Sequence, residues 1–171
     1  MNRTQRYPIL AAAVALVLIG ATLTPAVEKP NSVLAFEHLT SLVGEWKGTQ
    51  DGTEMKLTYT LTADGSALME EFRAAKIVLV TMFTVDGDHI IATHYCSAGN
   101  QPQMVTKAIT EPLAKSLTFS LSRVTGLKTP GDWHNTGLTV TMEDKQHLTQ
   151  VWTYEYDGKS GTNTFHFTRT R

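Results

Sequence analysis

The sequence predicts an all-β protein, an antiparallel up-and-down β-barrel of about ten strands preceded by one short helix. After Gly44, apolar and polar residues alternate with a period of two over most of the chain, and four Asp-Gly dipeptides fall between the alternating runs. A strand that alternates in this way buries one face and exposes the other. Asp-Gly suits two-residue hairpin turns because glycine adopts positive φ without steric cost and aspartate tolerates it.

The one predicted helix lies before the alternation begins. Phe36, Leu39, Leu42 and Val43 follow a helical spacing that Gly44 closes, which predicts a helix over this segment. The strands that follow are expected at residues 45–51, 55–62, 66–73, 77–85, 89–96, 103–110, 116–124, 137–142, 147–156 and 162–170. Closure into a barrel removes the edges of so many short strands. A two-sheet sandwich is the alternative arrangement.

The first 26 residues have the features of a signal peptide. Arg3 and Arg6 precede an apolar run over residues 9–23, which is shorter than the roughly 20 residues that a membrane-spanning helix needs. The expected division of the chain is a signal peptide at 1–26, a linker at 27–35 and a barrel domain at 36–171. We therefore expect an exported protein, periplasmic or extracellular, with no stable membrane span after cleavage.

Composition limits the possible partners and cross-links. Hydrophobic residues make up 42% of the chain and charged residues 18%, which is typical of a folded domain with a core. The formal net charge is −1, and loss of Arg3 and Arg6 with the signal peptide makes it more negative. No basic cluster follows, so nucleic acid is not an expected partner. The single cysteine, Cys96, excludes an intrachain disulfide. The sequence gives no indication of the oligomeric state.

The predicted strand 89–96 holds the most unusual combination of side chains. Ile90, Ala92, His94 and Cys96 share one face of it, and the small apolar residues favour this face as the inner one. His94 and Cys96 then point into the barrel roughly 6.6 Å apart along the strand. A neighbouring imidazole and thiol suit a soft metal ion, a Cys–His nucleophile, or the lining of a ligand pocket.

Pocket lining is the interpretation that the remaining sequence favours. A metal needs a third ligand and usually a fourth, and the sequence offers only His134 or Asp132 from a distant loop. Phosphate-binding loops, serine elbows and His-x-x-x-His motifs are also missing from the sequence. We therefore expect no catalytic residue, no metal site and no cofactor, with zinc as the alternative.

Two loops are expected at the mouth of the barrel. Asn100 and Gln101 lie in the polar segment 97–102, where their amides could reach a ligand. Trp133 and His134 lie in the longest turn-rich stretch of the chain, and we expect this pair to fold down as a lid or plug rather than stay exposed.

A small, largely apolar molecule bound without catalysis is the function that these features predict. Small-molecule sites combine apolar walls with a few polar groups. The expected walls include Leu57, Ile90, Ala92, Leu138 and Val140. The predicted pocket residues are Tyr59, His94, Cys96, Asn100, Gln101, Trp133, His134 and Trp152. The alternatives are a haem- or metal-binding barrel and a Cys/His-dependent enzyme.

The segment Gly44–Thr49, G-E-W-K-G-T, followed by a ten-strand meander resembles the calycin-type barrels: lipocalins, fatty-acid-binding proteins and nitrobindin-like proteins. The segments T-H-Y-C at 93–96, G-N-Q-P at 99–102 and L-T-Q-V-W-T at 148–153 are similar to an uncharacterised family of exported bacterial lipocalin-like proteins. The nitrobindin resemblance implies a b-type haem held by a histidine near the C-terminal end of the barrel. The histidine of this chain in that region is His166, which is expected to face outward among threonines, so haem is not favoured.

Overall fold

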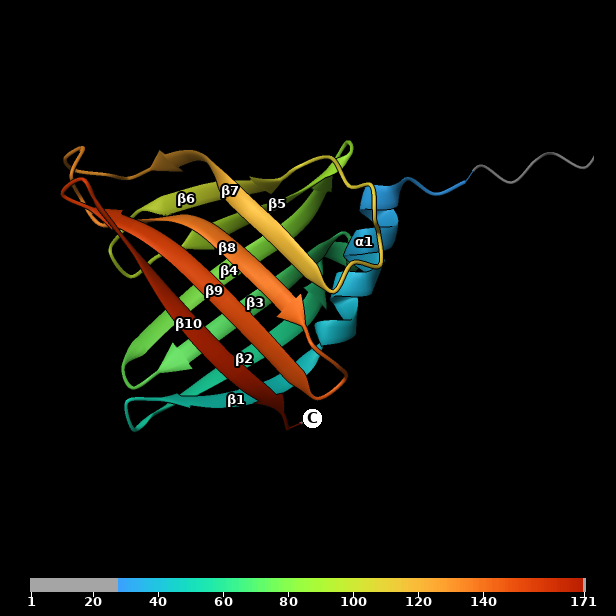
Figure 1. Cartoon of the computed structure of the whole chain (residues 1–171), viewed down its shortest axis with the longest axis horizontal. Helices are drawn as coiled ribbons and strands as arrows, with labels where there is room; N and C mark the ends of the chain where they lie inside the picture. The colour runs from blue at the N-terminus through green and yellow to red at the C-terminus, as the bar shows by residue number, and fades with distance from the viewer. Residues whose placement is uncertain (1–27, 171) are drawn as a thin grey trace, which may run out of the picture.

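The chain forms a closed antiparallel barrel of ten strands with one short helix at its N-terminal side, as Figure 1 shows. This computed structural model describes residues 28–170, and the expected signal peptide lies outside the described residues. The helix α1 spans Asn31–Leu39 and continues into a 3-10 turn at Thr40–Leu42. The strands are β1 Gly44–Gln50, β2 Thr53–Thr62, β3 Ala67–Ala74, β4 Ile77–Asp86, β5 His89–Tyr95, β6 Gln101–Thr106, β7 Ser116–Thr125, β8 His134–Met142, β9 His147–Tyr156 and β10 Lys159–Arg169.

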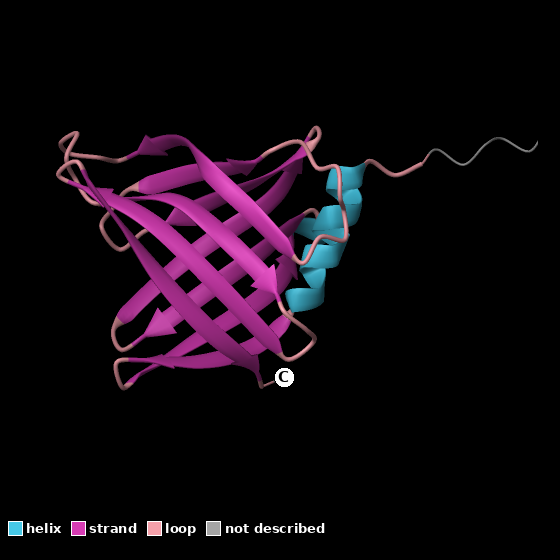
Figure 2. Cartoon of the chain, viewed as in Figure 1, coloured by secondary structure: helices cyan, strands magenta, loops and turns pink. Residues whose placement is uncertain are grey.

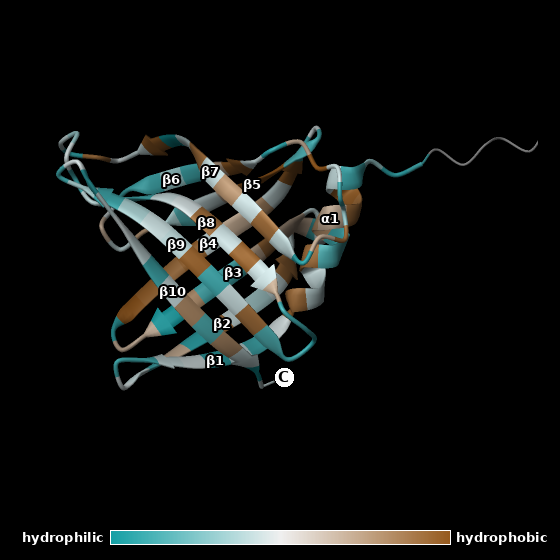
Figure 3. Ribbon diagram, in the orientation of Figure 1, coloured by the Kyte–Doolittle hydropathy of each residue, from teal (hydrophilic) through white to brown (hydrophobic). Residues whose placement is uncertain are grey.

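Every strand pairs with its neighbours in the chain, and β1 pairs with β10 to complete the ring. The predicted all-β barrel is therefore confirmed, and the sandwich alternative is excluded. None of the helices among residues 28–170 has the length and apolar character needed to cross a membrane. Polar and apolar residues alternate along the ribbons in Figure 3, which is the pattern that predicted the fold.

The four Asp-Gly dipeptides all lie at turns, but not at the same positions within them. Asp51-Gly52 and Asp157-Gly158 are two-residue turns in which both residues have positive φ, as a type I′ hairpin requires. At Asp86-Gly87 only the glycine has positive φ, because Asp86 is the last residue of β4. Asp64-Gly65 belongs to a 3-10 turn between β2 and β3. All four mark reversals of the chain, but only Asp51-Gly52 and Asp157-Gly158 form both central positions of a two-residue turn.

The helix begins five residues before the predicted start at Phe36, inside the segment expected to be a linker. Pro30 stands at its N-cap, and both Ser32 and Ala35 are buried against the barrel. Ser32 Oγ donates a hydrogen bond to the Gly87 carbonyl, 2.6 Å away in the β4–β5 turn. Because these two contact residues are small or polar, an apolar periodicity could not reveal the first turn and a half of the helix.

Strand β6 also differs from the prediction, since it begins at Gln101 and ends at Thr106. Pro102, which was expected to lie outside the ladder, is the second residue of this strand. It pairs with Val124 of β7, whereas the pairing of β6 with β5 covers only Gln103 to Val105. A proline is tolerated there because the ladder has a partner on one side only.

Helix α1 covers one end of the barrel, on the right in Figures 1 and 2. Phe36, Leu39 and Leu42 of this segment are buried in the same apolar cluster as the barrel residues at this end. In the same cluster Phe83 and Phe119 pack with ring centroids 5.7 Å apart. The helix end of the barrel is therefore filled by the protein's own side chains.

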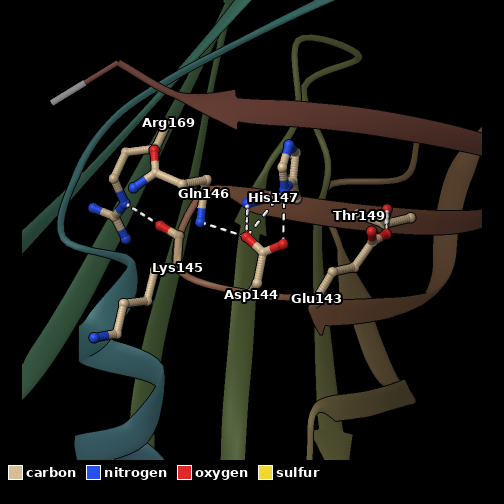
Figure 4. Close-up of polar contacts among 7 residues, drawn as sticks. All are labelled: Glu143, Asp144, Lys145, Gln146, His147, Thr149 and Arg169. Atoms are coloured by element: carbon tan, nitrogen blue, oxygen red, sulfur yellow. Dashed lines mark hydrogen bonds and ion pairs between the residues drawn. The ribbon is translucent and has the colours of Figure 1, made fainter.

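The seam between β1 and β10 is short, and Arg169 reinforces it. Its guanidinium donates hydrogen bonds to the carbonyls of Ser41 and Val43 at 2.7 and 2.8 Å, and its Nε donates to Lys145 in the β8–β9 turn. The guanidinium also lies 4.1 Å from the ring centroid of Trp46. Figure 4 shows Arg169 beside this turn, where Asp144 accepts hydrogen bonds from the backbone of Gln146 and His147.

We expect Arg169→Ala to lower the free energy of unfolding by about 2 kcal/mol, because three backbone carbonyls lose a donor and Trp46 loses its cation. Arg169→Lys should recover less than half of this loss, because an ammonium cannot reach three carbonyls in different directions. Urea denaturation measures both. Arg123→Ala, which removes an arginine bonded only to Gln103 on the outer face, is the control and should change stability by less than ~0.5 kcal/mol.

Candidate functional site

A cavity of about 560 Å³ occupies the half of the barrel opposite helix α1. Its mouth is formed by the turns after β1, β3 and β5 and by the segment before β8, which meet at the left of Figure 1. The lining residues are Gln50, Asp51, Thr53, Met55, Glu70, Phe72, Ala74, Ile77, Leu79, His94, Cys96, Ser97, Ala98, Trp133, Asn135, Gln150, Trp152, Asn163 and Phe165. Most of this surface is apolar, and the polar groups are concentrated at the floor and the rim.

The floor of the cavity is a row of polar side chains on four successive strands. Tyr59, Glu70, Thr81 and His94 are direct cross-strand neighbours on β2, β3, β4 and β5. All four are buried, each at 3% exposure or less. Because directly opposed residues on one face of a sheet lie in contact, the register alone places these groups side by side.

Hydrogen bonds run along the whole row. Tyr59 donates its hydroxyl proton to Glu70 Oε2 at 2.5 Å, and Thr81 Oγ1 lies 3.4 Å from Glu70 Oε1. The same Thr81 oxygen lies 3.0 Å from His94 Nδ1. Thr81 therefore links the carboxyl group to the imidazole.

Gln150 of β9 joins this row from another part of the barrel wall. Its Nε2 donates to Glu70 Oε2 at 2.5 Å and to the Tyr59 hydroxyl at 2.8 Å. Its Oε1 accepts a hydrogen bond from Trp152 Nε1 at 2.9 Å. The polar floor thus spans the interior from β2 to β9 and holds the Trp152 indole against the cavity.

Burial changes the acid–base properties of the floor. Loss of solvation raises the pKa of Glu70, while hydrogen bonds from Tyr59, Gln150 and Thr81 oppose the increase. Burial, together with the neighbouring carboxylate, raises the pKa of Tyr59 well above its ordinary value. Tyr59 is consequently a proton donor throughout the physiological range, and Glu70 is the acceptor toward which the network is directed.

His94 is the group of the floor that keeps an unpaired hydrogen-bonding atom. Its ring packs against Trp152 with centroids 4.8 Å apart, and burial lowers its pKa from 6.5 to about 4. Nε2 of His94 is buried and has no hydrogen-bond partner within the described residues. A buried nitrogen without a partner is costly. His94, whose side chain lines the cavity, therefore holds a neutral imidazole with one unused hydrogen-bonding atom.

Four of the predicted pocket residues line this cavity: His94, Cys96, Trp133 and Trp152. Cys96 is half-buried, and its sulfur accepts a hydrogen bond from the Ala98 backbone at 3.4 Å. Trp133 folds inward and packs on Tyr154, with ring centroids 5.5 Å apart. Tyr59, predicted as lining, lies instead in the floor behind Glu70.

The other three predicted pocket residues are outside the lining. Asn100 is buried between loops, where its Nδ2 donates to the Trp133 carbonyl at 2.7 Å. Gln101 contacts Gly99 and Thr125. His134 Nδ1 lies 2.8 Å from the Asp132 carbonyl oxygen. These side chains hold the loops of the mouth together, because each finds a partner in the nearby backbone or on the adjoining strand.

The residues expected to form the walls also divide into cavity-lining residues and core residues. Trp152 lines the cavity, whereas Leu57, Ile90, Ala92, Leu138 and Val140 are buried in the apolar core. These five residues do face the interior, as alternation predicts. Alternation gives the direction of a side chain but not its height along the barrel, and at their height the interior is filled.

Three central residues of the site, Glu70, Thr81 and Gln150, were not among the predicted site residues. A signal for Glu70 is present in the sequence, because period two places it between Leu68 and Phe72 on the inner face of β3. Gln150 likewise shares a face with Leu148 and Trp152. A charged or amide residue between two large inward apolar residues is the pattern that could have identified them.

The residues that the sequence suggested for a metal or a haem are not all gathered at this cavity. Within residues 28–170 no three histidine, cysteine, aspartate or glutamate side chains are grouped as metal ligands. His166, the histidine to which the nitrobindin resemblance points, is exposed on the outer face and lies 2.9 Å from Thr149 Oγ1. Figure 4 shows that Thr149 also contacts Glu143 on this outer surface.

Comparisons with solved structures identify the same fold in two other proteins. Rv2717c from M. tuberculosis superposes with a TM-score of 0.55 at 14% sequence identity, over 80% of this chain and 98% of the other. A DUF3598-family protein of unknown function from Nostoc punctiforme gives a TM-score of 0.51 at 13% identity, over 77% of this chain but only 48% of its own length. No family model and no curated protein sequence matches the chain. At these identities the two neighbours support the β-barrel fold alone.

Stability should depend on pH through His94. The pKa of His94 falls from 6.5 to about 4 on folding, so between these values the unfolded chain binds more protons and acidification destabilises the fold. Relative to His94→Phe, we expect wild-type protein to lose about 3 kcal/mol more between pH 7 and pH 4. The raised pKa of Glu70 acts in the opposite direction, but it contributes to both proteins. Urea denaturation at each pH measures the difference, and parallel profiles would contradict the prediction.

Proposed function

We propose that this protein binds a small, largely apolar ligand in the hollow half of its barrel, without catalysis. The observation that carries the proposal is the cavity of about 560 Å³, whose apolar wall ends at a floor with an unpartnered His94 Nε2. Ligand pockets typically have volumes of about 300–1,000 Å³ and a few polar groups that orient the ligand.

The shape of the interior supports binding rather than simple packing. Phe72, Phe165, Trp133 and Trp152 line the cavity, so a bound molecule would contact aromatic surface on several sides. Packed interiors leave few voids larger than a water molecule. A hollow of this size therefore leaves room for a bound ligand.

A Cys/His-dependent reaction has less support from the geometry. Nδ1 of His94 is directed to Thr81, and Nε2 has no partner, so neither nitrogen holds the Cys96 thiol. A thiol nucleophile needs a base within hydrogen-bonding distance. Cys96 is therefore assigned to the wall of the pocket.

Export is part of the proposal, on the strength of the signal-peptide features of residues 1–26. A protein outside the cytoplasm meets its ligand directly in the surrounding medium. Binding without chemical conversion would then serve capture or transport of that ligand.

Filling the cavity should abolish binding while the barrel stays folded. Ala74 lines the cavity on β3, so Ala74→Trp places an indole in the ligand's space. We expect its affinity for Nile red, followed by fluorescence titration, to fall at least about tenfold, a loss of about 1.4 kcal/mol.

The control is Arg73→Trp, because the adjacent residue points to the outer face and is exposed. It introduces the same side chain and should leave Nile red affinity within about twofold of the wild type. Both variants should retain a cooperative thermal transition. Equal affinities in the two folded variants, or no binding by wild-type protein, would contradict the proposed function.

A further inference from the structure

The charges around the cavity restrict the class of ligand, and the inference that follows rests on the proposed function. Two carboxyl groups line the cavity, Asp51 at the rim and Glu70 in the floor. No lysine or arginine is among the lining residues that the structure describes. An anionic ligand, such as a fatty acid, would therefore enter an apolar site without a cationic partner and beside a carboxylate, which is unfavourable.

The hydrogen-bond donors of the floor determine what His94 offers. Tyr59, Gln150 and Thr81 all direct protons to Glu70, and the carboxylate form satisfies the three donors. When the Thr81 hydroxyl donates to Glu70, 3.4 Å away, its oxygen is left to accept a proton from His94 Nδ1 at 3.0 Å, and this is the tautomer that we assign. Nε2 of the neutral imidazole then carries a lone pair and is an acceptor. In this tautomer the unpartnered Nε2, which belongs to a side chain that lines the cavity, requires a donor.

Aromatic rings surround the same position. Trp152 packs against His94 with ring centroids 4.8 Å apart, and Phe72, Phe165 and Trp133 complete the wall. The faces of such rings attract cations, tryptophan most strongly. An acceptor nitrogen, a nearby carboxylate and aromatic faces together form a site for a positively charged donor.

We propose that the ligand is a lipophilic amine, whose protonated nitrogen donates a hydrogen bond to His94 Nε2 while its apolar body lies against the aromatic wall. Glu70 lines the same cavity, and its carboxylate form compensates the charge of the ammonium group in the proposed complex. The Glu70 carboxylate is in turn stabilised by the bound cation. The mouth carries a second acid, Asp51, which attracts the amine on entry.

The test compares three probes with the same phenyl group and different charge: 2-phenylethylamine, 2-phenylethanol and 3-phenylpropanoate. Each probe is titrated by calorimetry at pH 7 into the protein comprising residues 27–171. Nile red fluorescence is an independent measure of binding in the cavity. We expect the amine to bind at least about tenfold more tightly than the alcohol, and the carboxylate to bind most weakly.

His94→Phe removes the acceptor but keeps a ring beside Trp152, and it should reduce the preference for amine over alcohol to below about threefold. His166→Phe, the same substitution at an exposed outer histidine, is the matched control and should keep the full preference. Glu70→Gln is a second test: it should weaken binding of the amine and leave binding of the alcohol unchanged.

The outcomes separate the two proposals. If the carboxylate or the alcohol binds as tightly as the amine, or if folded His94→Phe keeps the full preference, the amine inference is wrong while ligand binding stands. If wild-type protein binds neither Nile red nor any of the three probes, the proposed function itself fails.

Discussion

The contact on which the interior depends is the one that Gln150 makes across the barrel. Its amide meets both Glu70 and the Tyr59 hydroxyl, and so joins strand β9 to strands β2 and β3. A carboxyl group at 2% exposure can be kept inside an apolar barrel only when its oxygens have partners. Gln150, Tyr59 and Thr81 supply them. The resulting floor separates a filled half of the barrel from a hollow half.

The number of strands explains why a hollow exists. A barrel of eight strands can be just filled by side chains, and the diameter increases with each added strand. Here ten strands close, and helix α1 with Trp46 and Phe83 fills one end. Arg169 fixes that end by joining the last strand to the segment between helix and barrel. No second helix closes the opposite end in the described chain, so the extra interior volume is left there as a cavity.

The strands and the inward direction of His94 could be predicted because alternation with period two is a local property. The start of the helix could not, since Ser32 and Ala35 bury small or polar surface. The floor was harder still: Glu70 and His94 lie on β3 and β5 and meet only through Thr81 of the strand between them. That contact depends on the register of three strands, which the turns and the hydrophobic pattern set together and which the pattern of one strand alone does not give. Asn100 lies in the predicted loop and Gln101 opens β6, and their amides bond to Trp133, Gly99 and Thr125 rather than line the cavity.

The energetics of His94 argue for a role beyond packing. Burial holds its pKa near 4, and Nε2 remains without a partner, so the native fold is destabilised at this position both by acid and by an unpaired ring nitrogen. A leucine or phenylalanine would fill the same space beside Trp152 without either cost. The position instead holds a histidine, whose imidazole is oriented by Thr81 and, through Thr81, by Glu70. An oriented ring nitrogen without a partner adds no stability to the free protein, but it can form a hydrogen bond in a complex with a ligand. The proposed binding function therefore accounts for His94, which folding alone does not explain.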